Sequence, residues 1–273
     1  MKIQVLVATM CQNDHSLLER LNLQSDAVVV NQCNSDGKTL LKYKGYDILW
    51  IDSTERGLSR SRNMALKNAD GEICILCDDD EKMTEGYPEL INKAFCTLKK
   101  ADIVVFNIKR VGCCEQRYSS SEKIFKVPER VGYLKTYGSV HISFRRRKIV
   151  DNKIEFNENF GTGSGLYSNA EDAIFCMECH RKKLGMYTYP GIIGEVVFGT
   201  STWFTGYNEK YFYDVGAYLS VVFPKLKHLM KWYYPIHFRR LSSLSTLQII
   251  KHINYGFKGY KKRKSYEGYM GGK

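Results

Sequence analysis

The sequence lacks the features that mark membrane-spanning and secreted proteins. It contains no run of about 18 apolar residues, the minimum for a transmembrane helix. Its N-terminus, MKIQVLVATMCQND, has no basic segment followed by an apolar core and a small-residue cleavage site. With 44% hydrophobic and 13% aromatic residues, the 273 residues can still bury a core. We therefore expect a globular protein that neither spans a membrane nor carries a cleavable secretion signal.

The cysteines do not form a disulfide or zinc pattern. There are nine, an odd number, which favours reduced thiols. Cys74 and Cys77 fall in a predicted strand, where positions three apart face opposite sides. Cys176 and Cys179 fall in a predicted helix and share a face, but no second Cys/His pair nearby in the sequence completes a tetrahedral site. We expect buried thiols, with a zinc site as the alternative.

Acidic residues are nearly absent from the C-terminal part of the chain. Residues 225–273 contain twelve Lys and Arg against one acid, Glu267, so they supply +11 of the net charge of +12. Aromatic residues such as Trp232 and Tyr233 lie among these basic residues. Such a segment suits an anionic membrane surface. It also suits the phosphates of RNA or DNA, and a solvated tail without a partner is the third possibility.

Strand and helix patterns alternate in the first 108 residues. Near-continuously apolar strands separated by helices indicate an α/β fold with a mostly parallel central sheet covered on both faces. Ligands of such sheets bind beyond the carboxyl ends of the strands. We expect strands at 3–9, 27–32, 47–52, 72–78 and 101–108, and helices at 16–24, 59–69 and 86–100.

Four carboxylates follow the apolar strand in ICILCDDDE, residues 73–81. They could simply be a solvated loop that precedes the helix beginning near Gly86. Carboxylates concentrated at the end of a buried strand repel one another, however, unless a cation neutralises them. In an extended segment Asp78 and Asp80 point to the same side and can share one divalent ion. The phosphates of a nucleotide could complete its coordination.

These segments together resemble family 2 glycosyltransferases of the GT-A fold, especially bacterial enzymes of surface polysaccharide assembly. The resemblance rests on IQVLVAT, AVVVNQCNSDG, GLSRSRNMALKNADGEICILCDDDE and IEFNENFGTGSGLYSNAEDAIF, in that order. It covers residues 1–205 and implies a Rossmann-like sheet flanked by helices. It divides the chain into a nucleotide-sugar-binding half (1–108), an acceptor-binding half (109–205) and a helical basic and aromatic C-terminal extension (206–273).

The resemblance also assigns roles to residues of the first half. It implies a divalent metal, Mn²⁺ or Mg²⁺, bridging the diphosphate of the donor. The base would lie among Thr9, Asn31 and Asp36, the nucleotide against Arg62 and Asp79, and the ribose or metal at Asp78, with Asp80 as the principal metal ligand.

Glu171 and Asp172 follow a glycine-rich loop and open a predicted helix. Two acids in a first helical turn can serve only to stabilise the helix dipole. The resemblance implies instead that Asp172 is the general base that deprotonates the acceptor hydroxyl, with Glu171 orienting the acceptor or supporting Asp172. One displacement of this kind inverts the anomeric centre. The three glycines of 161–168 suggest a lid, and Trp203 either stacks on an acceptor sugar or belongs to the core.

We therefore expect an inverting, metal-dependent hexosyltransferase that transfers a sugar from a nucleotide-diphosphate donor, a UDP-sugar, to a lipid-linked glycan or polysaccharide. It would be cytoplasmic and held peripherally on the inner face of the cell membrane by residues 225–273, with no nucleic-acid partner. The alternatives are a nucleic-acid-binding protein with a basic tail, and a metal-dependent sugar nucleotidyltransferase. The latter usually has a glycine-rich, basic loop after the first strand, where this sequence reads TMCQNDHS.

Overall fold

A computed structural model of the chain describes residues 1–111, 124–197, 204–238 and 240–272. These residues form two compact units. The first comprises residues 1–56, 60–156 and 175–200, and the second comprises residues 57–59, 157–174 and 201–273. The two units are described separately below. The functional division predicted at residue 205 remains a proposal.

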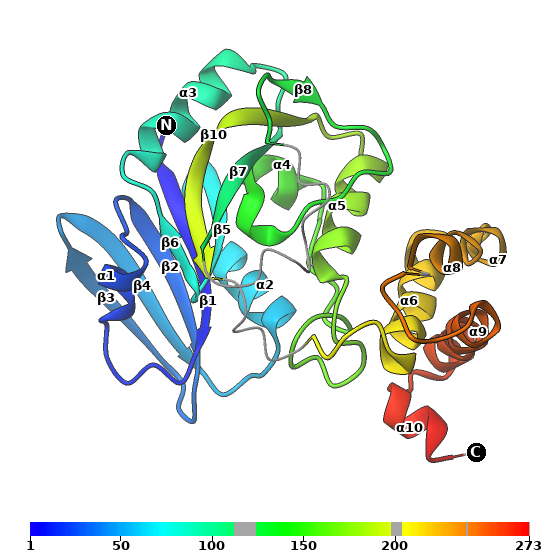
Figure 1. The fold of residues 1–273 in the computed structure, drawn as a ribbon. Coiled ribbons are helices and arrows are strands. Elements are labelled where there is room, and N and C mark those ends of the chain that lie inside the picture. The colour runs from blue at the N-terminus through cyan, green and yellow to red at the C-terminus, as the bar shows by residue number, and fades with distance from the viewer. Residues whose placement is uncertain (112–123, 198–203, 239, 273) are drawn as a thin grey trace. The chain divides into compact units, whose positions relative to one another are not determined.

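The first unit is built on a mixed sheet (Figure 1). Its order is β3-β4-β2-β1-β5-β9-β7-β10-β6, with β8 pairing β10. The strands are β1 (Ile3–Met10), β2 (Asp26–Gln32), β3 (Gly37–Tyr43), β4 (Tyr46–Ser53), β5 (Ile73–Asp78), β6 (Glu81–Met83), β7 (Ile103–Val111), β8 (Glu129–Arg130), β9 (Ile142–Arg145) and β10 (Met186–Val197).

The parallel part of the sheet, β4-β2-β1-β5, contains four of the strands expected from the sequence. Their register aligns the residues at the strand ends. Thr9 pairs with Asn31, and Asn31 pairs with Asp52 on its other side. Asp78 pairs with Ala8. Because parallel strands end at a common edge, these polar side chains are brought together there.

Three local features differ from the sequence-based expectations. β3 was not expected, and it forms an antiparallel hairpin with β4 through Lys44 and Gly45, both with positive φ, as a two-residue hairpin turn requires. The first helix is much shorter than 16–24, since α1 covers only Leu17–Arg20. Residues 81–83 form β6, which pairs with β10, so the acidic segment is a strand–turn–strand connection.

Helices cover both faces of the sheet. Against one face pack α1 and α3 (Tyr87–Thr97). Against the other pack α2 (Leu58–Asn68), α4 (Arg146–Asp151) and the later turns of α5 (Glu171–Arg181). A short 3₁₀ helix, η1, covers Ser139–His141. Cys74 and Cys77 lie in the clusters on opposite faces, and Cys176 and Cys179 are buried free thiols, as predicted.

The second unit contains a helical group with its own core. It consists of α6 (Glu209–Val222), α7 (Lys227–Met230), α8 (Tyr233–Phe238), α9 (Thr246–Lys262) and α10 (Tyr266–Met270), drawn in yellow to red in Figure 1. α6 and α9 cross closely enough that a Cβ on Gly256 would lie 2.0 Å from the carbonyl oxygen of Tyr213. The basic extension is thus a folded helical body. None of the helices described is both long and apolar enough to cross a membrane.

Candidate active site

The edge of the sheet presents a row of polar residues whose side chains bind one another. The amide of Asn31 is 1% exposed and donates to Asp52 Oδ1 (2.8 Å) and to the carbonyl of Gln12 (3.0 Å). Its oxygen accepts the Gln12 backbone N–H at 3.0 Å. Asp52 Oδ1 also accepts the Trp50 indole N–H at 3.0 Å. Both amide hydrogens of Asn31 are therefore used within the protein, and its role here is to orient Asp52 and the loop after β1.

Arg62 on α2 is buried against this edge. Its side chain is 2% exposed, and Nη2 donates to Asp78 Oδ1 at 2.9 Å, to Asp78 Oδ2 at 3.2 Å and to Ser139 Oγ at 2.7 Å. The guanidinium also lies 5.3 Å from the centre of the Phe156 ring. The structure thus makes Arg62 the residue that holds Asp78, and its predicted contact with the nucleotide stays a prediction.

Asp79 and Asp80 form the turn between β5 and β6. Asp79 Oδ2 accepts the hydroxyl of Thr9 at 2.7 Å, which ties this turn to the end of β1. The expectation that Asp78 and Asp80 share a side of one extended strand is wrong, because the chain turns between them. Their proximity comes from the turn.

Glu81, the fourth acid, is buried at 3% exposure and faces Gly194 on β10, where a Cβ would lie 2.6 Å from its Oε1. Within the described residues, neither carboxylate oxygen has a partner of acceptable hydrogen-bond geometry. Burial raises the pKa of Glu81 well above its usual value, and Asp78 raises it further, while the Cys77 thiol and the Asp78 backbone oppose this weakly. Glu81 is thus a buried acid whose surroundings favour its protonated form.

A divalent cation fits this turn if a donor molecule supplies part of its coordination. Among the residues that the structure describes, no group of three or more His, Cys, Asp or Glu side chains is placed to hold a metal ion. Asp78 and Asp80 offer hard oxygen ligands. Burial, followed by repulsion from Asp78 and Asp79, raises the pKa of Asp80, and a cation would relieve both effects. Two carboxylates suit a metal whose other ligands are phosphate oxygens and water.

Asp36 lies in the loop after β2 and is exposed. Its Oδ1 accepts the Thr54 backbone N–H at 2.7 Å, and both carboxylate oxygens contact the Thr54 hydroxyl. Arg56 ties the same loops together, with Nη1 donating to the carbonyl of Cys33 (2.7 Å) and Nη2 to Asn34 Oδ1 (2.9 Å). These contacts shape the loops beyond β2 and β4.

In the second unit, the glycine-rich loop is closely held. The Leu58 N–H donates to the carbonyl of Thr162 at 2.9 Å, and a Cβ on Gly163 would lie 3.2 Å from Gly57 Cα. The side chain of Tyr167 is almost fully buried. The glycines therefore permit tight turns and a close backbone approach, and the lid suggested by the sequence stays a prediction.

The loop ends at Ala170, whose φ of 81° is unusual for a residue with a Cβ. Glu171 and Asp172 follow as the first turn of α5, as the sequence predicted. Glu171 is 9% exposed and packs against Gly161, where a Cβ would lie 3.2 Å from its Cδ. Asp172 is half-buried. The loop and the first turn, which carries the predicted base Asp172, thus form one packed segment.

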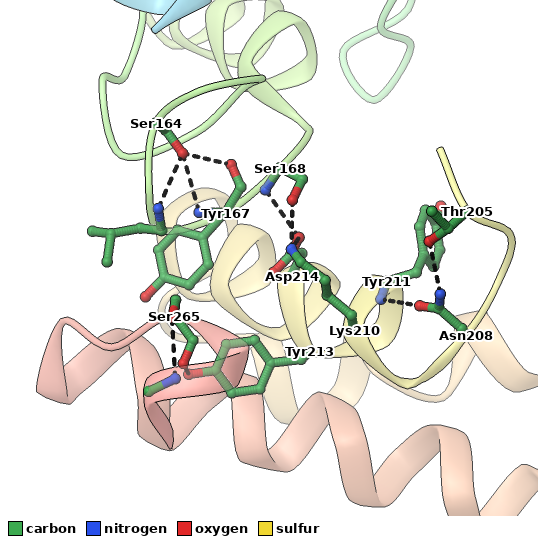
Figure 2. A network of polar contacts seen from close by, with 12 residues as sticks. Ser164, Tyr167, Ser168, Thr205, Asn208, Lys210, Tyr211, Tyr213, Asp214 and Ser265 are labelled. Atoms are coloured by element: carbon green, nitrogen blue, oxygen red, sulfur yellow. Dashed lines mark hydrogen bonds and ion pairs between the residues drawn. The ribbon is translucent and has the colours of Figure 1, made fainter. Parts of the chain in front are cut away.

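Two side chains of α6 anchor this loop (Figure 2). Asp214 is 1% exposed, and its Oδ2 accepts the Ser168 backbone N–H at 3.0 Å and the Lys210 ammonium at 3.2 Å. Lys210 also donates to Ser168 Oγ. Desolvation raises the pKa of Asp214, and Lys210 opposes this. The helical unit therefore fixes the backbone four residues ahead of Asp172.

The structure brings together Thr9, Asn31, Arg62 and Asp78–Asp80, and it places Glu171 and Asp172 in the other unit. The sequence-based prediction omitted Asp52, although it ends the neighbouring strand. It also omitted Lys210 and Asp214, for which no local signal exists. Trp203 lies outside the described residues.

Solved structures with similar folds include TarS and a mannosyltransferase. TarS from S. aureus (residues 1–349, with UDP-GlcNAc) superposes with a TM-score of 0.61 at 15% identity, covering 97% of this chain and 93% of that one. A mannosyltransferase from Pyrobaculum calidifontis, PcManGT, solved with GDP-Man and Mn²⁺, gives 0.55 at 14% identity, covering 98% and 77%. At these identities the likeness concerns the fold, and it confirms the predicted GT-A architecture.

The sequence comparisons address the family directly. No curated protein sequence matches the chain. The family profile described as Glycosyl transferase family 2 matches residues 11–165, more than half of the 273 residues. This match includes Arg62 and Asp78–Asp80 and ends before Glu171. The chain therefore belongs to glycosyl transferase family 2 and is a glycosyltransferase.

Proposed function

We propose that this enzyme is an inverting, metal-dependent glycosyltransferase. It transfers a sugar from a nucleotide-diphosphate donor, with UDP-sugars as the first class to test, to a hydroxyl group of a lipid-linked glycan or polysaccharide of the bacterial surface. The observation that carries this proposal is the strand-end cluster, in which the buried Arg62 fixes Asp78 beside the turn that bears Asp79 and Asp80. The solved relatives hold UDP-GlcNAc and GDP-Man, which are donors of this chemical class.

Asp78 and Asp80 would hold the cation, Mn²⁺ or Mg²⁺. When bound, the metal supplies positive charge that stabilises the departing nucleoside diphosphate. The protein contributes the placement of the two carboxylates: Arg62 orients Asp78, and Thr9 secures the turn through Asp79. Asp52, oriented by Asn31 and Trp50, offers its second oxygen to the base or ribose of the donor.

Asp172 would act as the general base. An alcohol is a weak nucleophile until its proton is removed, and a positioned carboxylate can accept that proton as the oxygen attacks the anomeric carbon. The new C–O bond forms as the bond from the anomeric carbon to the phosphate oxygen breaks, so a single displacement inverts the configuration. The start of α5 favours the ionised form of a carboxylate. Glu171 would support Asp172 or orient the acceptor.

Residues 225–273 would keep the enzyme on the anionic inner face of the cell membrane, where a lipid-linked acceptor resides. Their charge supports this placement, since Glu267 is the only acid among them. Because the chain is a glycosyltransferase, neither the nucleic-acid-binding alternative nor the nucleotidyltransferase alternative is retained.

The test measures nucleoside diphosphate release from a panel of nucleotide sugars, with Mn²⁺ or with a chelator. Asp80→Ala should abolish the metal-dependent release of nucleoside diphosphate. Asp172→Asn should lower transfer by a factor on the order of 10²–10⁴, the usual contribution of a general base, while metal-dependent nucleotide binding persists.

Glu89→Gln is the control, because Glu89 is also an acid in the first turn of a helix, α3, but it is exposed and belongs to no predicted site. NMR of the product should show an inverted anomeric centre. Two results would overturn the proposal. One is nucleoside diphosphate release that is unchanged by the chelator and by Asp80→Ala; the other is a product with retained anomeric configuration.

A further inference from the structure

An unusual group of apolar side chains is exposed between residues 226 and 247. Leu229 is 68% exposed, Ile236 80% and Leu247 78%. In water each of these side chains loses the free energy that burial would provide, and exposed apolar side chains that gather on one surface mark an interaction site. The group, called here the docking face, consists of Leu226, Leu229, Trp232, Tyr233, Ile236, Leu241 and Leu247.

The docking face is distinct from the surface by which α7 and α8 pack against the core of the helical group. At four-residue spacing, Met230, Tyr234 and Phe238 pack against the core formed by α6 and α9. A second stripe at three- and four-residue spacing is exposed: Leu226, Leu229, Tyr233 and Ile236. The turn between α7 and α8 keeps a helical path, since Lys231 N–H donates to the carbonyl of Lys227 at 3.0 Å. α7 and α8 therefore present apolar residues both inward and outward.

The part of the sequence that carries the docking face is basic and contains no acid. The sequence from Val215 to Tyr266 contains no Asp or Glu. Exposed basic side chains in this part of the helical group include Lys225, Arg240, Lys251 and Lys258. Lys231 lies 5.7 Å from the Trp232 ring centre and extends to Asn254 Oδ1 at 3.2 Å. The face thus combines aliphatic groups, interfacial aromatics and cations.

This combination selects among the possible occupants. A second copy of the chain would bring an equally basic face against this one, and like charges would repel. A nucleic acid would pair with the cations but would leave Leu229 and Ile236 without an apolar partner. An anionic bilayer offers both acyl chains and phosphates, and it suits tryptophan and tyrosine at the boundary between them.

We propose that the docking face inserts into the interfacial region of an anionic lipid bilayer while the surrounding Lys and Arg pair with lipid phosphates. This deepens the proposed membrane contact, on which it rests, by naming the inserting side chains. It predicts two separable contributions to binding: an electrostatic one that salt screens, and an apolar one that persists in salt.

The experiment is sedimentation of the full chain with vesicles of phosphatidylglycerol and phosphatidylcholine, and with phosphatidylcholine alone. Ile236→Glu should weaken binding to the mixed vesicles roughly tenfold or more, since one inserted aliphatic side chain is replaced by a charge. Leu40→Glu is the matched control, because Leu40 is also 80% exposed but lies on β3 in the other unit. It adds the same charge and should bind like the native protein.

Two further readouts decide the mode of binding. Fluorescence that shifts to the blue on vesicle addition should be lost in Trp232→Phe, which would place that ring in the bilayer interface. The proposal would be overturned if high salt removed vesicle binding entirely. It would also be overturned if Ile236→Glu and Leu40→Glu reduced vesicle binding equally. So would an oligomer that Ile236→Glu converts to a monomer while vesicle binding is unchanged. Vesicle binding needs neither donor nor acceptor, so these results are independent of whether the proposed sugar transfer holds.

Discussion

The Arg62 guanidinium lies 2.9 Å from Asp78 Oδ1, and the two side chains are 2% and 27% exposed. The pair joins the buried face of α2 to the end of β5, so the cation is inside the protein while the carboxylate faces the edge where ligands of parallel sheets bind. Ser139 Oγ accepts a second hydrogen bond from the same nitrogen. Asp78 is thereby held in one orientation before any ligand arrives.

Replacing Arg62 by Met should therefore damage both stability and donor use. The variant leaves the Asp78 carboxylate without its cation, and since Asp78 is partly exposed we expect a loss of about 2 kcal/mol in unfolding free energy. Urea unfolding and nucleoside diphosphate release measure the two effects. Arg60→Met is the control, because Arg60 is exposed on the same helix. Equal unfolding free energies and equal release rates for Arg62→Met and Arg60→Met would show that the Arg62–Asp78 pair is dispensable.

The buried Glu81 should make stability depend on pH. Its folded pKa lies above the ordinary value of 4.5, so the folded protein binds the proton more tightly than the unfolded chain does. The stability of the native protein relative to Glu81→Gln should fall as the pH rises from 4.5 through the raised pKa, and then stay constant. Unfolding free energies measured across this range test it. Glu85→Gln, at an exposed position nearby, should show no such trend; a pH-independent difference for Glu81→Gln would contradict the raised pKa.

The Asp214 anchor should affect transfer without affecting nucleotide binding. Asp214→Asn keeps an oxygen for the Ser168 N–H but loses the charge that holds Lys210, whereas Asp214→Ala loses both contacts. We expect transfer rates in the order native, Asn, Ala, with the Ala variant down at least roughly tenfold, equivalent to about 1.4 kcal/mol. Nucleotide affinity, measured by calorimetry, should stay native in both. A parallel loss of nucleotide affinity would argue for general unfolding.

Gly256 should be intolerant of any side chain. A Cβ there would lie 2.0 Å from the Tyr213 carbonyl oxygen and 2.9 Å from Gly216 Cα, both backbone atoms of α6. Gly256→Ala must separate α6 from α9 and should cost roughly 2 kcal/mol or more through overpacking. Thermal unfolding measures this loss. Gly37→Ala is the control, since a Cβ on Gly37 meets nothing within 4 Å; a native melting temperature for Gly256→Ala would show that the two helices are not closely packed.

The same contact changes how the basic segment should be studied. α9 contributes Ile249, Ile253 and Phe257 to a core shared with Phe212 and Leu219 of α6. Deleting residues 225–273 would expose that core. If the truncated protein moved from the membrane fraction to the soluble fraction, the change would report unfolding of the helical group as well as loss of membrane contact. Point variants on the docking face avoid this ambiguity.

The sequence by itself determined the parallel strands, the edge where their polar ends gather, and the family. These follow from local patterns: apolar strands with fixed periodicity, and acids placed directly after them. The sequence also indicated α5 with its acidic first turn and the buried cysteines. It failed at β3, where the alternation in GKTLLKY is weak because the strand lies at an exposed edge.

Only the tertiary structure decided what the site residues contact. Arg62 meets Asp78 sixteen positions away, Thr9 meets Asp79 seventy positions away, and Asp214 meets Ser168 from a helix that no motif connects with it. Such contacts depend on how elements pack, and packing is set by side chains distributed along the whole chain. The same holds for the docking face, because which side of an amphipathic segment is buried depends on the helices already packed against it.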